Sequence, residues 1–349
     1  MYNPAEDPCD VPTVRGPAPP APARRPWSIR RTTSIDTSWP EGEGTALHMT
    51  GRARDLVTPD ANGAACVVGE DSFVADLTPQ RQITEIAMEP PRAGAQKLVG
   101  ARAGSQLRAA IAVAMPLELE QGTPLYLLLD DIAGASLVSI WAWSQWHQKW
   151  DLSVTRGPGA AELRRKMEGV CIGFAPDSPV MIGSDNDRIE NPRLVEPLDN
   201  GADPLAWHIM PPTNGFAGDG PVARRARRID VHVEDEKVVV SSHFQDSSSR
   251  PDGQRMAVHE YLLSATVNRH TMLIETIAAD PRVLPFAYCP AATLNIGRMI
   301  GKPVGDLRKT VVAELAKAEG CTHLNDMLRS LAEVPQMLAS LTAAKTRSG

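Results

Sequence analysis

The chain has 349 residues, of which 42% are apolar and 22% charged, so it has room for about two domains and the composition of a globular protein. It carries 36 basic and 42 acidic residues, and the formal charge of −6 argues against nucleic acid as a partner. The longest apolar stretch, Leu125 to Trp143, is interrupted by Asp130 and Asp131, which excludes it as an uninterrupted membrane span.

The first 28 residues are predicted to form a disordered, proline-rich tail. They include the run VPTVRGPAPPAPARRP, in which the prolines fix φ and remove backbone donors. Glu6 and Asp7 stand where a secretory signal needs a basic start and an apolar run, so we expect a cytoplasmic protein. The five cysteines are an odd, sparse set, which indicates free or metal-binding thiols rather than a disulfide framework.

The remaining chain contains an internal repeat. Residues 73–92 resemble residues 261–282, residues 98–100 resemble residues 299–301, and Gly122 matches Gly320. The order is the same and the offset drifts by about ten residues, as in a duplication with a few insertions. Chance similarity between alanine-rich segments is the alternative explanation. We interpret the chain as four parts: a tail at 1–28, a first repeat at 29–150, a Pro/Gly-rich connection at 151–223 and a second repeat at 224–345.

Each repeat is predicted to place its strands before its helices. In the second repeat, alternating apolar residues predict hairpins over 229–244 and 258–278. Apolar residues at helical spacing then predict helices over 291–299, 304–318 and 323–341. The predicted fold class is α+β: a tandem duplication of an antiparallel sheet with helices packed on one face.

Potential metal ligands are concentrated in the second repeat. His259-Glu260 stands there where the first repeat has Asp71-Ser72, and Gly320-Cys321-Thr322-His323 stands where the first repeat has Gly122-Thr123-Pro124-Leu125. Cys289 lies in an insertion that the first repeat lacks. The second repeat is therefore predicted to be active and the first to be degenerate.

The predicted metal site consists of His259, Cys289 and Cys321, with His323 as a fourth ligand or as an acid–base group beside the metal. The three ligands converge if the strand of His259 lies under the helices that begin after the two cysteines. Imidazole with soft sulfur favours zinc, and iron or an iron–sulfur cluster is the alternative cofactor. The competing interpretation is that these residues only pack the core, since a buried cysteine is usually a small apolar residue.

Other candidate site residues surround this set. Glu260 and Asp326 are predicted, with His323, to move protons or to orient a ligating histidine. Trp143, Trp146 and His208 are predicted to contact substrate. The alternatives are that Glu260 faces solvent, that the tryptophans pack between the domains, and that His208 lies on the surface.

The second repeat resembles a known family. The segments VHEYLLSATVN, LP..YCPAA and GCTHLNDMLRSLA, within about Arg227 to Leu341, are similar to a bacterial family of unassigned function, domain of unknown function 2889, whose hallmark is Cys-Thr-His-Leu. More distantly, the order of hairpin, cysteine and apolar-Gly-Lys turn resembles iron–sulfur scaffold proteins of the NifU/SufE-like type. That second resemblance implies zinc or cluster binding, but His259 replaces the first cysteine of the pattern, which favours a permanent metal over a labile cluster.

These observations predict a metal-dependent bacterial enzyme of the lyase, isomerase or hydrolase type. Its substrate is predicted to be a small, largely apolar molecule, of aromatic or terpenoid-like character, because tryptophans and a long connection could cover the site. The predicted partners exclude nucleic acid and membranes and leave a homodimer open. The alternatives are a metal or iron–sulfur carrier without turnover, and an interaction module with a structural zinc ion.

Overall fold

The structure is a computed structural model of the chain. It describes residues 11–60, 64–147, 160–184, 189, 193–195, 205, 207 and 220–348. Within these residues, nine strands form one antiparallel sheet. The first half contributes four strands, β1 (Ser28–Ser38), β2 (Leu47–Thr58), β3 (Cys66–Leu77) and β4 (Ile83–Glu89). The second half contributes β6 (Ala223–Glu234), β7 (Lys237–Ser249), β8 (Arg255–Asn268) and β9 (Ile274–Val283), and the short β5 (Leu194–Val195) comes from the connection.

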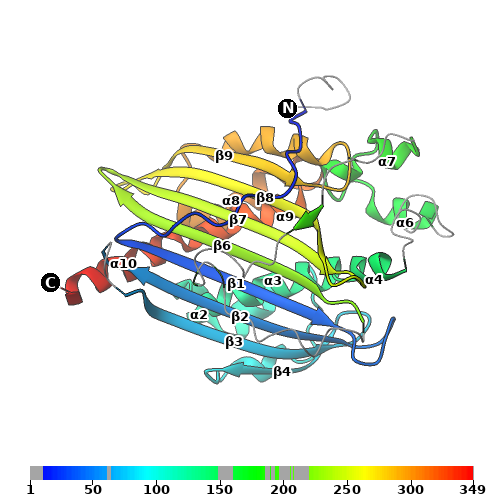
Figure 1. The fold of residues 1–349 in the computed structure, drawn as a ribbon, viewed down its shortest axis with the longest axis horizontal. Coiled ribbons are helices and arrows are strands. Elements are labelled where there is room, and N and C mark those ends of the chain that lie inside the picture. Colours follow the sequence, from blue (N-terminus) through cyan, green and yellow to red (C-terminus); the bar gives the residue numbers. More distant parts are fainter. Residues whose placement is uncertain are drawn as a thin grey trace.

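The sheet has the order β4-β3-β2-β1-β6-β7-β8, with β9 and β5 both paired to β8. Its centre is the antiparallel pair β1–β6, which runs from Ser28 opposite His232 to Thr37 opposite Ala223. The hairpins predicted in the second half are present as β6–β7 and β8–β9. The two halves therefore join through backbone hydrogen bonds into a single continuous sheet (Figure 1).

Helices follow the strands in each half and cover one face of the sheet (Figure 1). In the first half they are η2 (Ala95–Leu98), α1 (Leu107–Ala114), α2 (Pro116–Gln121), α3 (Pro124–Val138) and α4 (Trp141–Trp146). In the second half they are η4 (Cys289–Met299), η5 (Val304–Asp306), α8 (Leu307–Glu314), η6 (Lys317–Glu319), α9 (Thr322–Ser330), η7 (Leu331–Glu333) and α10 (Val334–Ser348). The described part of the connection adds α6 (Ala160–Met167), η3 (Ile172–Phe174) and α7 (Pro179–Ile182). The predicted α+β class, an antiparallel sheet with helices, is confirmed.

Two apolar cores lie between the sheet and the helices, because alternate strand residues face the helix layer. One core joins β6–β9 to the second-half helices and includes Val240, Phe244 and Met327. The other joins β2–β4 to the first-half helices and includes Phe73 and Leu128. No helix among the described residues is long and apolar enough to cross a membrane.

The two halves also share turn geometry. Gly100 and Gly301 both have a left-handed backbone, with φ of 88° and 77°. The N–H of each donates at 2.8 Å to the carbonyl of the first residue of the edge strand, Ile83 in β4 and Ile274 in β9. Both halves thus place four strands before their helices and share this turn, and the tandem duplication stays a prediction.

The N-terminal segment differs from the predicted disordered tail. Residues 11–27 lie across the sheet face that is opposite the helices (Figure 1). The N–H of Ala18 donates to Glu260 at 2.9 Å, and the guanidinium groups of Arg282 and Arg30 donate to the carbonyls of Pro17 and Pro22 at 2.7 and 2.9 Å. Prolines keep free carbonyl acceptors, which the buried side chains of the sheet bind.

Candidate metal centre

Three potential metal ligands meet where β7, β8 and α9 approach one another. Asp246 on β7 and His259 on β8 are register partners in the antiparallel ladder, so their side chains lie on the same, helix-facing side of the sheet. His323 is the second residue of α9, which packs over this side. One ligand atom from each of Asp246, His259 and His323 lies within 4.8 Å of the others.

The three side chains are in close contact. His259 Nδ1 lies 3.5 Å and His323 Nε2 lies 3.8 Å from Oδ2 of Asp246. The two imidazole rings stack with centroids 3.5 Å apart and an interplanar angle of 17°. The histidine side chains keep 11% and 14% of their surface exposed, so the site is buried but not sealed.

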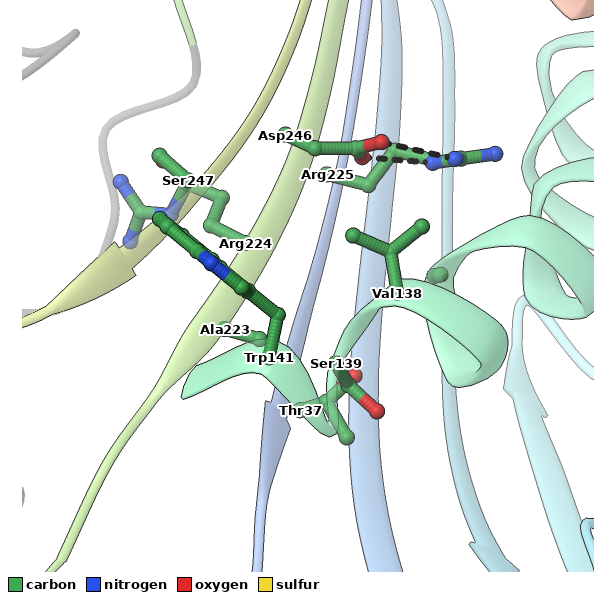
Figure 2. Close-up of a pocket in the computed structure, with 10 residues that line it drawn as sticks. Thr37, Val138, Ser139, Trp141, Ala223, Arg224, Arg225, Asp246 and Ser247 are labelled. Carbon is green, nitrogen blue, oxygen red and sulfur yellow. Dashed lines mark hydrogen bonds and ion pairs between the residues drawn. The ribbon is translucent and has the colours of Figure 1, made fainter. Parts of the chain in front are cut away.

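The charges of the surroundings suit metal binding. Burial raises the pKa of Asp246, but the nearby Arg225 guanidinium outweighs this and holds that pKa below its usual value. Arg225 donates to both carboxylate oxygens at 2.8 and 2.9 Å (Figure 2). Burial lowers the pKa of His259 and of His323, and the second imidazole lowers the pKa of His323 further. An ionised carboxylate and two neutral imidazoles therefore present lone pairs to one point.

The equivalent place in the first half has the salt bridge without the histidines. Arg31 donates to both oxygens of Asp55 at 2.7 Å, as Arg225 does to Asp246. In the ladder, however, Gly69 stands opposite Asp55. The predicted counterpart of His259, Asp71, is therefore wrong: strand register makes it Gly69, two residues earlier.

At the helix, Thr123 and Cys321 precede α3 and α9 in the same way, so Leu125 takes the place of His323. Leu125 is fully buried in the first-half core. The arginine–aspartate pair is thus common to both halves, and the two imidazoles are particular to the second half.

Two of the four predicted ligands join the converging group. His259 and His323 come together with Asp246, which was not predicted from the sequence. Cys321 Sγ lies 3.8 Å from Nδ1 of His323, but neither Cys321 nor Cys289 belongs to the group whose ligand atoms converge. Both cysteines are buried in the second-half core.

Of the three predicted acid–base residues, His323 belongs to the converging group, and Glu260 and Asp326 do not. Glu260 lies on the opposite sheet face from His259, because adjacent strand residues alternate, and there it accepts hydrogen bonds from His243 and Gln245 at 2.8 Å. Asp326 lies behind the site, where its carboxylate binds Arg225 at 3.1 Å. Glu260 is therefore separated from the histidines by the sheet, whereas the negative charge of Asp326 is close enough to raise the pKa of His323.

The predicted substrate residues are also placed apart from the histidines. Trp143 packs edge-on against Trp39 at 5.7 Å, and Trp146 Nε1 donates to the Ser249 carbonyl at 3.0 Å. His208 lies outside the described residues. A different tryptophan, Trp141, lines a cavity of about 10 Å³ beside Asp246 (Figure 2), which has room for about one water molecule.

The sequence was compared with known proteins. Residues 223–336, about a third of the chain, match a family model described as "Protein of unknown function (DUF2889)". This segment contains all three residues of the candidate metal centre. No curated protein and no solved structure matches the chain, so the resemblance to NifU-type scaffolds stays a prediction.

Proposed function

We propose that the second half of the chain binds a zinc ion through Asp246, His259 and His323. The ion would serve a reaction of the hydrolase, lyase or isomerase type. The observation that carries the proposal is the convergence of three ligand atoms within 4.8 Å of one another. Two imidazoles and one carboxylate are a donor set that zinc takes in catalytic sites. The same set also binds iron(II), so the identity of the metal is part of the test.

The number of ligands favours a catalytic ion over a structural one. Structural zinc sites are closed by four protein ligands, whereas catalytic sites keep one position for water or substrate. In that position the ion would act as a Lewis acid or lower the pKa of a bound water. Of the three proposed ligands, only Asp246 lines the small cavity described above, which has room for about one water molecule.

The surrounding residues would orient the ligands. Arg225 holds the Asp246 carboxylate by both oxygens and keeps it ionised. Nδ1 of His323 faces Cys321 Sγ at 3.8 Å and the Thr322 hydroxyl at 3.4 Å. A proton on Nδ1 leaves the lone pair of Nε2 free on the side of Asp246, which is the tautomer that a metal needs.

The cavity beside Asp246 is too small to identify a substrate. Val138 and Trp141 line it on the helix side, and the charged residues that line it, Arg224, Arg225 and Asp246, are engaged in ion pairs. A volume of about 10 Å³ accommodates a water molecule at most, so the proposal of a small, largely apolar substrate rests on the sequence alone.

Metal analysis of the full chain tests the proposal. Protein purified without added metal is expected to contain about one zinc ion per chain. The variant His259→Gly/His323→Leu restores the residues that the first half has at these positions, and it should lose the ion while keeping its circular dichroism spectrum. The matched control is His48→Gln, which removes an exposed first-half histidine whose Nδ1 lies 2.8 Å from Asp76, and it should retain the ion.

Two results would contradict the proposal. Metal content that is the same in the double variant and in the wild type would exclude the two histidines as ligands. One iron ion per chain in place of zinc would contradict the proposed identity of the metal. Turnover is tested with an activated ester, which the metal-loaded chain should hydrolyse faster than the double variant does. Equal rates would contradict the hydrolytic reaction.

A further inference from the structure

An open groove lies beside the N-terminal segment, on the sheet face opposite the helices. Its volume is about 1050 Å³, which is enough for a small organic molecule. Three parts of the chain that are far apart in sequence line it: the N-terminal segment, strands β6 to β9, and η4. Pro19, Pro20 and Pro22 of the segment are exposed toward solvent, as is Leu294 of η4, so much of the lining is accessible apolar surface.

Strand register explains the shape of the floor. Ser241 on β7 stands opposite Ser264 on β8, which stands opposite Ala278 on β9. These side chains therefore lie on one face of the sheet, and because they are small they leave a trough across three strands. The neighbouring row contributes Leu262 on β8 and, at the β6 end of the trough, Arg228.

The proline wall of the groove is held in place at several points. The N–H of Arg15 donates to a β9 carbonyl at 3.3 Å, the Pro17 carbonyl accepts from a β9 arginine, and the N–H of Ala18 donates to β8. The Pro22 carbonyl accepts from β1. Since proline also fixes φ between these points, the groove is formed before any ligand binds.

Arg228 is a buried cation that faces this groove. Its side chain is only 2% exposed, and its Nε lies 2.8 Å from Oδ2 of Asp230, which also binds Arg30. Its two terminal amino groups make no hydrogen bond to a described residue. Burial lowers the pKa of Arg228, an effect that Asp230 opposes and Arg30 reinforces. The one carboxylate that two guanidinium groups share thus leaves Arg228 incompletely neutralised.

The charges that line the groove favour an anionic ligand. They are Arg228, Arg15 and Asp280. Asp280 lies 3.7 Å from Arg15 and 3.2 Å from Arg282, so its charge is already balanced and the groove keeps the positive charge of Arg228. The terminal amino groups of a guanidinium match a carboxylate through two parallel hydrogen bonds.

We propose that this groove binds an amphipathic carboxylate, with its carboxylate on the terminal amino groups of Arg228 and its apolar body along Leu262, Ala278 and the proline wall. The body would run from β6 toward Leu294, beyond β9. These strands are three spacings apart, or about 14 Å, which suits a chain of roughly eight to ten carbons. Ser241 and Ser264 offer hydroxyl groups along the way.

The groove is separate from the candidate metal centre. Asp246 and His259 face the helices, whereas Arg228 and Ser264 face the other side of the sheet. The proposal therefore does not depend on the function proposed above, and a chain that binds no metal should still bind the carboxylate.

Isothermal titration calorimetry of the full chain with octanoate tests the proposal, with 1-octanol as the uncharged analogue. Octanoate should bind saturably to one site per chain, and 1-octanol should bind at least about tenfold more weakly because it lacks the charge that pairs with Arg228. Arg228→Gln should weaken octanoate binding by a similar factor. Asp230 keeps Arg30 as its partner in this variant, so no carboxylate is left unpaired.

A second variant tests the groove without touching a buried charge. Ser264 is exposed, and Ser264→Leu fills the trough, so octanoate should bind at least about tenfold more weakly while the circular dichroism spectrum is unchanged. The matched control is Val74→Leu, at an exposed residue of β3, and it should bind octanoate as the wild type does. Equal affinities for octanoate and 1-octanol, non-saturable uptake, or unchanged binding in Ser264→Leu would each overturn the proposal. These outcomes hold even if Arg228→Gln does not fold.

Discussion

Arg225 shows how single residues of this protein carry several roles at once. Its guanidinium is buried, binds Asp246 by both oxygens, and also lies 3.5 Å from Asp131 and 3.1 Å from Asp326. Buried charges of this kind are stable only when each partner is present. The candidate metal ligand Asp246 is therefore held by a charge network that extends behind the site.

Asp326 provides a test of that network. Burial raises its pKa, but Arg329, Arg225 and Arg108 outweigh this and lower the pKa from 3.8 to about 2. A carboxyl group whose pKa is lowered by folding stabilises the fold at pH values above its pKa in the unfolded chain. This stabilisation is lost as the pH falls toward its folded-state pKa of about 2. Asp326→Asn should therefore lose about 2 kcal/mol of unfolding free energy at pH 7, and its deficit should shrink below about pH 4.

Urea unfolding of Asp326→Asn and of the wild type at pH 7 and pH 3 measures this difference. The control is Asp76→Asn, since the Asp76 side chain is 43% exposed and its loss should be small at both values. A deficit of equal size at pH 7 and pH 3 would show that the charge of Asp326 does not stabilise the fold.

The sequence predicted part of the site for identifiable reasons. His259 and His323 were found because the first repeat lacks them. Asp246 was missed because its counterpart Asp55 is also an aspartate, so the comparison of repeats gave no contrast. Glu260 could have been excluded from the predicted site, because it directly follows His259 on one strand and adjacent strand residues face opposite sides of a sheet.

At the scale of elements, the predicted hairpins are present, the predicted second-half helices are divided into shorter α and 3₁₀ segments, and the N-terminal segment differs from its prediction. A proline-rich stretch has no alternation to read, and its binding to the sheet depends on its carbonyl groups and on its few N–H groups. The N–H of Arg15 donates to the carbonyl of Pro281 at 3.3 Å, and the N–H of Ala18 donates to the buried carboxylate of Glu260 at 2.9 Å.

Ala18→Pro removes this N–H without changing the proline-rich character of the segment. We expect a cost of about 1 to 3 kcal/mol for attachment of the segment, because a charged acceptor loses one of its donors. Limited proteolysis should then cleave residues 11–27 faster than in the wild type. Ala23→Pro, at an exposed alanine of the same segment, should leave the rate unchanged, and equal rates in both variants would rule out the role of this hydrogen bond.

At the scale of the whole molecule, the seam between β1 and β6 makes one unit of two halves. Charged side chains pair across it in addition to the backbone: Arg224 with Asp36 at 2.7 Å and Arg227 with Asp131 at 2.6 Å. The sequence predicted two related repeats. It carried no sign of this seam, because nothing in an isolated strand specifies which distant edge it will pair with.

The seam predicts that the halves unfold together. All seven tryptophans precede residue 208, but Trp146 and Trp207 contact β7 of the second half. Tryptophan fluorescence therefore reports on the first half and on its contacts with β7, while far-ultraviolet circular dichroism reports on both halves. The two signals should give the same midpoint in urea. Two separate midpoints, with fluorescence changing at a different urea concentration, would mean that the β1–β6 seam does not couple the halves.

One ion pair of the seam also bears on how this sequence can change over time. Arg31, in the first strand, is buried against Glu333, which lies 302 positions away near the last helix. Arg31 also binds Asp55 and Glu333 also binds Arg308, so replacement of either charge unbalances a buried network of four charged side chains. A substitution at the start of the chain is therefore expected to favour a compensating substitution near its end, which couples the two halves as the sequence changes.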